Sequence, residues 1–270
     1  MQIRFKQKVA VITGAGAGIG YEIARQLVSE GANVVLNDVD EALARQAAGK
    51  IDQEGAGSCV AFPGDAGSVA VVRGVVDEAV KRFGRLDIAI ANAGITLFGD
   101  FFEFEPEAFR KVVAVNQQGA FFLAQAAAKQ MRRQKQPGGH LLFMSSVVGH
   151  RAYRNLTAYA MTKAALSMMA RSLVLELSPY GIQVNAIAPG ATLTERTAKE
   201  APDYAGTWRA ITPNRRVGLP EDVAAVALWL LLPEARHVNG QTLFVDGGWT
   251  AVGQNPEEIP GLSPKQKNQT

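Results

Sequence analysis

Short apolar runs alternate along this chain with longer segments in which apolar residues recur three or four positions apart. The short runs are typical of buried strands, and the longer periodic segments are typical of helices. The runs predict strands at residues 9–12, 34–36, 59–62, 86–91, 141–144, 184–188 and 243–245. The periodic segments predict helices through Ile23, Ala24, Leu27 and Val28, and at residues 41–54, 69–83, 106–133, 159–177 and 221–232.

This regular alternation predicts one α/β domain, in which a parallel sheet is covered by helices on both faces. Right-handed crossovers then give a single-domain Rossmann-type doubly wound sheet of about seven strands. We expect the domain to cover residues 1–253, because the chain shows no internal repeat and no linker rich in Gly, Pro or Ser. Residues 254–270 carry prolines among polar residues, so we expect a loosely attached polar tail.

Composition and charge favour a folded intracellular protein. The 270 residues are 47% hydrophobic, which is enough for a substantial core, and the net charge of +3 is too small to indicate nucleic-acid binding. The single cysteine, Cys59, cannot form an intramolecular disulfide, and residues 1–8 show no signal peptide. No apolar stretch is long enough to span a membrane, so we expect a cytoplasmic protein without a membrane or nucleic-acid partner.

A glycine-rich segment joins the first predicted strand to the first predicted helix. Gly14, Gly18 and Gly20 fit the spacing T-G-x-x-x-G-x-G, whereas G-x-G-x-x-G counted from Gly14 would need a glycine where Ile19 stands. A helix N-terminus offers unpaired N–H groups and a positive dipole end, and glycines let a phosphate approach the backbone. The segment therefore predicts a dinucleotide-binding loop, and a tight turn without a ligand is the alternative.

Asp38 follows the second predicted strand. A carboxylate at this point accepts hydrogen bonds from the adenosine ribose hydroxyls and repels a 2′-phosphate. Because Ala17 and Val39 stand where a cation would be needed to receive that phosphate, we expect NAD(H) rather than NADP(H) as the cofactor, and no metal. The alternative is that Asp38 only caps the helix that begins near Glu41.

Three further residues form a candidate catalytic set. Tyr159 and Lys163 lie one helical turn apart, and Ser146 follows a predicted strand at the sheet edge where ligands collect. A free tyrosine has a pKa of about 10, but a close ammonium and an oxidised nicotinamide would lower it. Tyr159 would then exchange a proton with an alcohol oxygen that Ser146 holds in place. Chance occurrence of three common residue types is the alternative.

In their order and spacing, these motifs resemble those of the short-chain dehydrogenase/reductase family over residues 8–249. The resemblance implies an enzyme that transfers hydride between a nicotinamide and a secondary alcohol or ketone, with Tyr159 as general acid/base, and a homotetramer. The closing segment Asp246-Gly247-Gly248 is similar to the D-G-G of this family.

The resemblance also ranks candidates for the catalytic set. It places the catalytic serine at Ser146 rather than at the neighbouring Ser145, because the distance to Tyr159 along the chain is the usual one. It adds Asn116, which resembles the asparagine thought to hold a water that relays protons through Lys163.

For the cofactor, the resemblance implies that Asp65 meets the adenine amino group and that Lys163 bonds the nicotinamide ribose. Ala91 stands where the N-N-A-G segment of the family begins with asparagine. The residues expected to contact the cofactor are Gly14, Ala17, Gly18, Ile19, Gly20, Asp38, Val39, Asp65, Ala66, Asn92, Ala93, Gly94, Tyr159, Lys163, Pro189, Gly190, Thr192 and Thr194.

Substrate choice in this family resides in a mobile segment that here spans residues 193–213, and residues 149–157 also line the site. These segments contain Glu195, Arg196, Lys199, Tyr204, Trp208, Arg209, His150, Arg151, Tyr153 and Arg154. We hypothesise a small polar substrate such as a sugar, polyol or hydroxy acid, and the alternative is that these charges only face water. A 3-oxoacyl reductase is a further alternative, but that activity commonly uses NADPH and Asp38 argues against it.

Two other classes of function stay open. A methyltransferase that uses S-adenosylmethionine also binds its cofactor at a glycine-rich loop, but it needs no Tyr159–Lys163 pair. A non-catalytic NAD-binding protein would share the fold, and the complete set of Ser, Tyr, Lys and Asn argues against it.

Small residues in two predicted helical segments favour close contact between helices. They are Ala124, Ala126, Ala127, Ala128, Ala160, Ala164 and Ala165. We predict that residues 106–133 and the helix from Tyr159 form a subunit interface, and packing on the sheet of the same subunit is the alternative.

Overall fold

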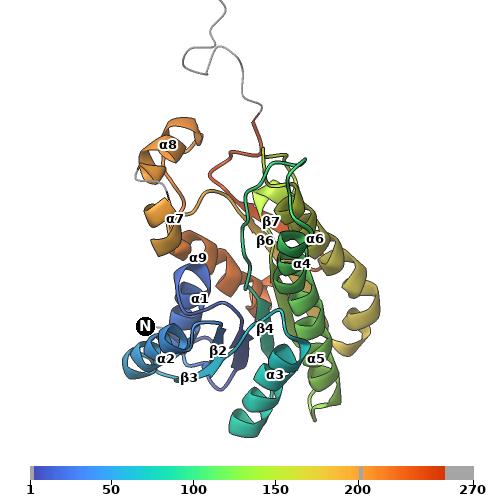
Figure 1. Cartoon of the computed structure of the whole chain (residues 1–270). Coiled ribbons are helices and arrows are strands. Elements are labelled where there is room, and N and C mark those ends of the chain that lie inside the picture. Colours follow the sequence, from blue (N-terminus) through green and yellow to red (C-terminus); the bar gives the residue numbers. More distant parts are fainter. Residues whose placement is uncertain (1–2, 201–202, 253–270) are drawn as a thin grey trace, which may run out of the picture.

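The computed structural model describes residues 3–200 and 203–252, which form one α/β body (Figure 1). In this part of the chain, seven strands form one parallel sheet in the order β3-β2-β1-β4-β5-β6-β7. The strands are β1 (Val9–Ile12), β2 (Asn33–Asp38), β3 (Ser58–Pro63), β4 (Ile88–Ala91), β5 (Gly139–Met144), β6 (Ile182–Pro189) and β7 (Thr242–Val245). The strand order reverses between β1 and β4, so the predicted doubly wound fold is confirmed.

Helices cover both faces of the sheet (Figure 1). They are α1 (Gly18–Ser29), α2 (Glu41–Glu54), α3 (Val69–Phe83), α4 (Pro106–Val113), α5 (Gly119–Arg133), α6 (Thr157–Leu177), α7 (Glu195–Glu200), α8 (Tyr204–Ile211) and α9 (Pro220–Leu230). Alternate residues of β1 lie in the two core layers, one on each face of the sheet. Ala10 and Ile12 pack with α1, α2 and α9, whereas Val9 and Val11 pack with α3, α5 and α6. This double burial explains why the strands are continuous apolar runs.

Local signals at the helix ends explain why α2 and α3 have their predicted bounds. The Asp40 side chain accepts a hydrogen bond from the Leu43 N–H at 3.0 Å and so caps α2. Gly84 ends α3 in the left-handed conformation, with φ of +76°, and its N–H bonds the carbonyl of Val80.

Several predicted strand and helix ends differ from the structure by two residues, and two of them have a clear local cause. β4 begins at Ile88 rather than at residue 86, because the Gln134 side chain binds both the N–H and the carbonyl of Leu86, each at 2.9 Å. α9 ends at Leu230 rather than at residue 232, because Leu232 precedes Pro233 and is extended.

Two predicted segments also contain elements that the sequence did not predict. Residues 106–133 are not one uniform α-helix, since a π-helical turn (Ala114–Gln118) separates α4 from α5. Residues 193–213, expected as a mobile segment, contain the short helices α7 and α8.

Ala124 and Ala127, which were assigned to a subunit interface, are buried in the core layer beside the sheet. The predicted tail at residues 254–270 lies outside the described residues.

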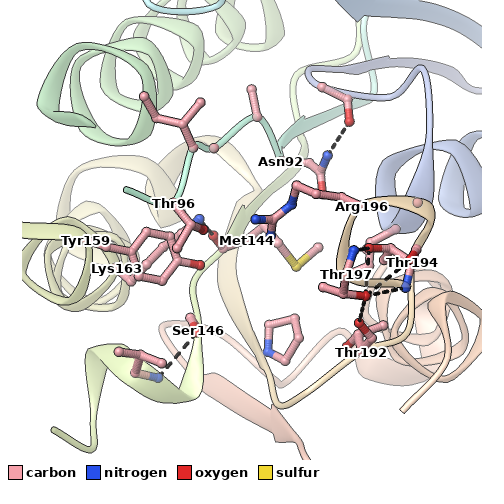
Figure 2. Close-up of a pocket in the computed structure, with 18 of the residues that line it drawn as sticks. Asn92, Thr96, Met144, Ser146, Tyr159, Lys163, Thr192, Thr194, Arg196 and Thr197 are labelled. Atoms are coloured by element: carbon pink, nitrogen blue, oxygen red, sulfur yellow. Dashed lines mark hydrogen bonds between the residues drawn. The ribbon is translucent and has the colours of Figure 1, made fainter. Parts of the chain in front are cut away.

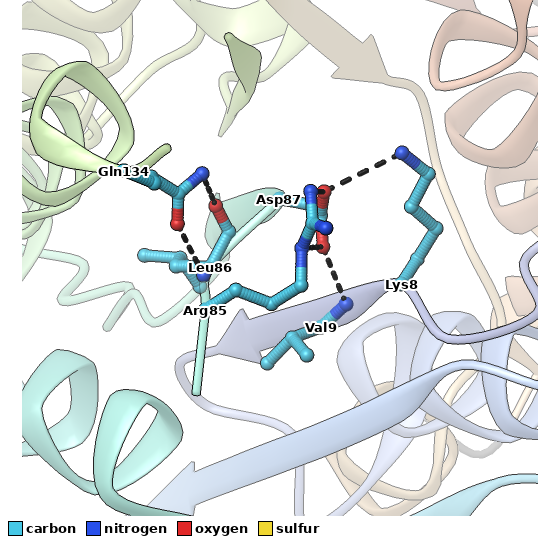
Figure 3. A network of polar contacts seen from close by, with 6 residues as sticks. All are labelled: Lys8, Val9, Arg85, Leu86, Asp87 and Gln134. Atoms are coloured by element: carbon cyan, nitrogen blue, oxygen red, sulfur yellow. Dashed lines mark hydrogen bonds and ion pairs between the residues drawn. The ribbon is translucent and has the colours of Figure 1, made fainter. Parts of the chain in front are cut away.

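A polar network fixes the amino end of the sheet (Figure 3). The buried Asp87 carboxylate accepts hydrogen bonds from the Val9 N–H at 3.0 Å and from the Arg85 guanidinium at 2.6 and 2.9 Å, and the Lys8 ammonium lies 3.4 Å away. Its backbone also bonds Val9 and His140 on the two neighbouring strands. This network joins β1, β4 and β5 at the end opposite to the one where ligands collect.

Among the described residues, no helix is long and apolar enough to cross a membrane. The same residues contain no group of three or more His, Cys, Asp or Glu side chains that could hold a metal ion.

Candidate active site

A cavity of about 780 Å³ opens at the carboxyl ends of the strands. The structure brings nearly all the predicted site residues to its wall: Gly14, Ala17, Gly18, Ile19, Asp38, Val39, Asp65, Ala66, Asn92, Ala93, Gly94, Ser146, Tyr159, Lys163, Pro189, Gly190, Thr192 and Thr194. Two predicted residues, Gly20 and Asn116, do not line it. Residues from loops far apart in the sequence thus meet at the edge where α/β sheets bind ligands.

The loop between β1 and α1 packs closely against the segment after β4. A Cβ atom at Gly14 would lie 2.7 Å from the Ala93 Cα, and one at Gly20 would lie 2.5 Å from the Asn92 Nδ2. The Asn92 amide also donates hydrogen bonds to the Gly14 carbonyl at 2.6 Å and to the Thr13 carbonyl at 3.0 Å. Gly20 therefore serves the packing of the protein itself, which explains its place outside the cavity wall.

The N-terminus of α1 faces this cavity. Gly18 begins the helix with φ of +61°, and the first turn carries no acidic side chain. Ala17 and Ile19 line the cavity beside it. Unpaired N–H groups and a positive dipole end thus face the cavity, as anion binding requires. A carboxylate from another segment lies close by, because the Glu195 Oε2 would be 3.9 Å from a Cβ atom at Gly18.

Asp38 ends β2 and is oriented by the glycine loop. One carboxylate oxygen accepts a hydrogen bond from the Gly16 N–H at 2.9 Å, and the other accepts one from the Asp40 N–H at 3.1 Å. The alternative that Asp38 caps α2 is wrong, because Asp40 is the capping residue. The contact with Gly16 was not predicted, since a backbone N–H leaves no signal in the sequence.

The two neighbouring serines after β5 have different surroundings. The Ser145 hydroxyl is buried and donates to the Lys163 carbonyl at 2.8 Å, with the Ser167 hydroxyl 2.9 Å away. Ser146 instead lies next to the Tyr159 hydroxyl, and its own oxygen accepts a weak hydrogen bond from the Val148 N–H at 3.3 Å. Of the two candidates, only Ser146 is placed beside the phenol.

Tyr159 lies in the first turn of α6, and its ring points into the cavity together with Thr96 and Ser146 (Figure 2). Burial raises the pKa of Tyr159, while hydrogen bonding to Ser146 and Thr96 and the charge of Arg196 act in the opposite direction. The predicted lowering of this pKa is therefore not a property of the protein alone. Thr96, which was not among the predicted residues, follows the Asn92–Gly94 segment by two positions.

Lys163 is buried behind the tyrosine ring. Its ammonium donates a hydrogen bond to the Met144 carbonyl at 2.6 Å and lies 5.6 Å from the centroid of the Tyr159 ring. A Cβ atom at Gly94 would lie 3.1 Å from this ammonium, so the glycine makes room for it. Burial lowers the pKa of Lys163 to about 8.

Asn116 lies in the π-helical turn and is fully buried. Its amide donates to the Ile95 carbonyl at 3.0 Å and to the Thr162 hydroxyl at 3.2 Å, and its oxygen accepts from the Ile95 N–H at 2.8 Å. The side chain thus ties the segment after β4 to α6. In this structure Asn116 is a positioning residue for the cavity wall.

The segment after β6 is folded by hydroxyl groups (Figure 2). The Thr197 hydroxyl accepts from the Thr194 N–H at 2.8 Å and donates to the Thr192 carbonyl at 3.0 Å. Arg196, the residue before Thr197 on α7, reaches from this segment toward Tyr159 in Figure 2. Thr197 was not predicted, because its role depends on this local fold.

The geometry can be compared with that of known proteins. Residues 14–250 match the family model described as Enoyl-(Acyl carrier protein) reductase. The chain is 37% identical over 250 residues to the 7alpha-hydroxysteroid dehydrogenase of Escherichia coli K12, covering 91% of this chain and 95% of that protein. It is 36% identical over 247 residues to the L-rhamnose-1-dehydrogenase of Scheffersomyces stipitis, covering 89% and 95% of the two chains.

A solved structure has the same fold at comparable identity. It is a 7 alpha-hydroxysteroid dehydrogenase complexed with NADH and 7-oxo glycochenodeoxycholic acid, with a TM-score of 0.85 and 36% identity, covering 92% of this chain and 96% of that one. The fold, the cavity and these relatives define an oxidoreductase that acts on CH–OH groups. The chain belongs to the short-chain dehydrogenase/reductase family.

Proposed function

We propose that this protein is an NAD(H)-dependent oxidoreductase that interconverts a secondary alcohol and a ketone, with Tyr159 as the general acid/base. The observation that supports this most strongly is one cavity in which Ser146, Tyr159 and Lys163 lie beside the N-terminus of α1. Neither a methyltransferase nor a non-catalytic binding protein needs all four features together.

The residues of the cavity fit a dinucleotide. The N-terminus of α1 suits the diphosphate, and the Asp38 carboxylate at the end of β2 suits the adenosine ribose hydroxyls. We assign the nicotinamide end to the segment from Pro189 to Thr194 and to Lys163, whose ammonium has two further N–H donors for a ribose hydroxyl. NAD(H) is preferred because Asp38 would repel a 2′-phosphate and the adjacent Val39 offers no cation.

Proton transfer is the task of the protein side chains. The bound nicotinamide accepts the hydride in oxidation and supplies it in reduction. The Ser146 hydroxyl holds the alcohol oxygen, and Tyr159 takes the hydroxyl proton as the carbon–hydrogen bond breaks. Burial raises the pKa of Tyr159, and the hydrogen bonds to Ser146 and Thr96 and the charge of Arg196 oppose it. We assign the remaining stabilisation of the phenolate to the Lys163 ammonium, 5.6 Å from the ring centroid, and to the positive charge of the oxidised cofactor.

The test is the change in absorbance of the reduced nicotinamide during a screen of alcohols and ketones, with NAD and NADP run in parallel. Turnover of at least one secondary alcohol, faster with NAD, is expected. Asp38→Asn should reduce this preference about tenfold, because it removes the repulsion of a 2′-phosphate. Calorimetry that detects S-adenosylmethionine binding but no NADH binding would overturn the assignment.

The small polar substrate stays a prediction. The argument from the polar residues of segments 149–157 and 193–213 is weakened, because only some of them reach the cavity. Of the residues on which it rested, half line the cavity: Tyr153, Glu195, Arg196, Tyr204 and Trp208. The other half do not: His150, Arg151, Arg154, Lys199 and Arg209. His150 instead hydrogen-bonds Ser167 at 2.9 Å.

We also propose a homo-oligomer, for which a homotetramer is the specific expectation. Ala124 and Ala127 are buried within the protomer, but Phe121, Met161 and Met168 on α5 and α6 are 46%, 57% and 59% exposed. Exposed apolar side chains of this size favour burial against a second copy. Light scattering that gives a monomer at micromolar concentration would contradict the proposal.

A cytoplasmic location is part of the same proposal. Cys59 is buried, and burial raises the pKa of its thiol to about 12, so this thiol is unreactive. A protein without disulfides whose lone thiol is part of the core suits a reducing compartment.

A further inference from the structure

Two tryptophans from distant parts of the chain meet at the wall of the catalytic cavity. Trp208 on α8 and Trp249 after β7 have ring centroids 5.5 Å apart and planes inclined by 78°. Tyr204, one turn earlier on α8, lies 6.1 Å from Trp208. All three line the same cavity as Tyr159. We call Trp208 and Trp249 the aromatic jaw.

The Trp249 side of the jaw is firmly held. The Arg151 guanidinium lies 4.5 Å from the centroid of the Trp249 ring and donates hydrogen bonds to the Trp249 carbonyl at 2.9 Å and the Val252 carbonyl at 3.2 Å. The Asp246 carboxylate shapes the preceding turn by accepting from the N–H groups of Gly248 and Thr250. Trp249 is only 8% exposed, so it forms a fixed wall.

Helix α8, which carries Trp208, packs less tightly against the rest of the protein than the segment of Trp249 does. No residue of α8 is buried, and the segment after it is joined to the turn before Trp249 by a 3.2 Å hydrogen bond from the Asn214 N–H to the Gly247 carbonyl. An element with few buried contacts opens at low cost, and α8 can therefore admit a ligand between its own tryptophan and the fixed one.

We propose that the aromatic jaw grips the ring of a cyclic secondary alcohol or ketone whose reacting carbon lies at Tyr159. This inference rests on the proposed function and names its substrate class. An indole face binds the C–H face of a ring, whether the ring is alicyclic or a polyol, and a ring loses less conformational freedom on binding than an open chain.

A buried donor on Trp249 distinguishes between the two kinds of ring. Its indole N–H has no hydrogen-bond acceptor among the described residues. A buried unpaired donor is destabilising, so a ring oxygen that meets it when α8 moves away from Trp249 would be stabilising. The jaw therefore favours a ring that carries further oxygen atoms over a purely apolar ring.

Four alcohols with six carbons each can distinguish the effect of a ring on kcat/KM from the effect of polarity. Cyclohexanol and myo-inositol are the rings, and 3-hexanol and mannitol are their open-chain counterparts. The wild type should show kcat/KM at least about tenfold higher for a ring than for the open chain of the same polarity, since one aromatic contact contributes about this factor. Equal values for rings and open chains would overturn the inference.

Two variants test the jaw itself. Trp249→Leu and, separately, Trp208→Leu should raise KM for the rings about tenfold, with little change in kcat and none in KM for the open chains. Trp229→Leu is the matched control, because Trp229 lies on α9, is 41% exposed and does not line the cavity. An equal rise in KM for rings and open chains would contradict a grip on the ring.

Fluorescence of the wild-type protein provides a test that does not depend on turnover, and Trp229→Leu adds a control. The chain has three tryptophans, and two of them form the jaw. Binding of the ring probes should change the emission maximum and intensity of the wild-type protein and of Trp229→Leu alike, because it changes the surroundings of the jaw, and the open chains should not. Absence of any change with both rings overturns the inference even if NADH binds, whereas absence of NADH binding overturns the proposed function.

Discussion

The two ends of the parallel sheet each bury a charged group, and they surround it differently. At the amino end, the Asp87 carboxylate accepts from a backbone N–H and a guanidinium and has an ammonium 3.4 Å away (Figure 3). At the carboxyl end, the Lys163 ammonium bonds one carbonyl, and in the described ranges 3–200 and 203–252 no carboxylate pairs with it. The first charge is compensated by the protein, and the second is not.

This difference indicates that Asp87 stabilises the fold, whereas Lys163 serves the reaction. A compensated carboxylate orients three strands and has no capacity left for a ligand. An ammonium with unused donors, whose pKa burial lowers to about 8, is stabilised when a ligand supplies acceptors or a phenolate forms nearby. Substitution of Asp87 should therefore change stability and leave activity unchanged, whereas substitutions of the groups that surround the Tyr159 hydroxyl should change activity.

The largest expected effect on stability is that of Asp87→Ala. The variant leaves the Val9 N–H and the Arg85 guanidinium without their acceptor, and we expect the free energy of unfolding to fall by about 3 kcal/mol. Urea denaturation measures this, and kcat/KM of the folded fraction should be unchanged. Lys8→Met is the control, because its ammonium is half exposed and should matter by less than about 1 kcal/mol.

The adjacent serines give a matched pair at the other end. Ser146→Ala should lower kcat/KM about a hundredfold, or about 2.7 kcal/mol, with an unchanged melting temperature, because it removes the hydroxyl beside the phenol. Ser145→Ala should instead cost about 1 kcal/mol of stability and leave kcat within a few-fold, because its hydroxyl bonds α6. The reverse pattern would show that Ser145 is the catalytic serine.

Lys163→Met should abolish turnover and yet stabilise the protein at pH 7 by about 2 kcal/mol. The native pKa of about 8 lies below the unfolded value of 10.5, so the unfolded state holds more protons between these two values. Stability of the wild type therefore rises with pH across this interval, and the advantage of the variant should vanish near pH 10.5. Thermal melts from pH 7 to 10.5 that show a less stable variant throughout would contradict this.

His140, at the start of β5, should give the smallest effect. Burial and the Lys8 ammonium lower its pKa to about 4, against the opposing charge of Asp87. The unfolded state therefore binds more protons between pH 6.5 and 4, and stability falls as the pH falls through this interval. In His140→Gln, the free energy of unfolding should fall by about 1–2 kcal/mol less than in the wild type over this pH interval, as measured by thermal melts between pH 6.5 and 4. His237→Gln, at an exposed histidine, should leave it unchanged.

The comparison also shows what a sequence can predict. Buried strands and sheet-covering helices carry their own periodicity, so β1 and the bounds of α2 and α3 were predictable. Ser145 and Ser146 could be recognised as a pair, but which of them lies beside the Tyr159 hydroxyl depends on the exit of the chain from β5. The contact of Trp208 with Trp249 and the bonds of Asn116 to Ile95 join separate segments. No local sequence pattern encodes contacts between distant segments. α7 could not be predicted because it is too short to show a helical period of apolar residues.

The central claim is that Tyr159 transfers the substrate proton in an NAD(H)-dependent reaction. Its most direct test measures kcat and the dissociation constant of NADH for the wild type and for Tyr159→Phe, using any alcohol that the wild type oxidises. The account predicts a loss in kcat of about a thousandfold, with the dissociation constant unchanged within about twofold. A phenylalanine variant that retains its kcat would contradict the account.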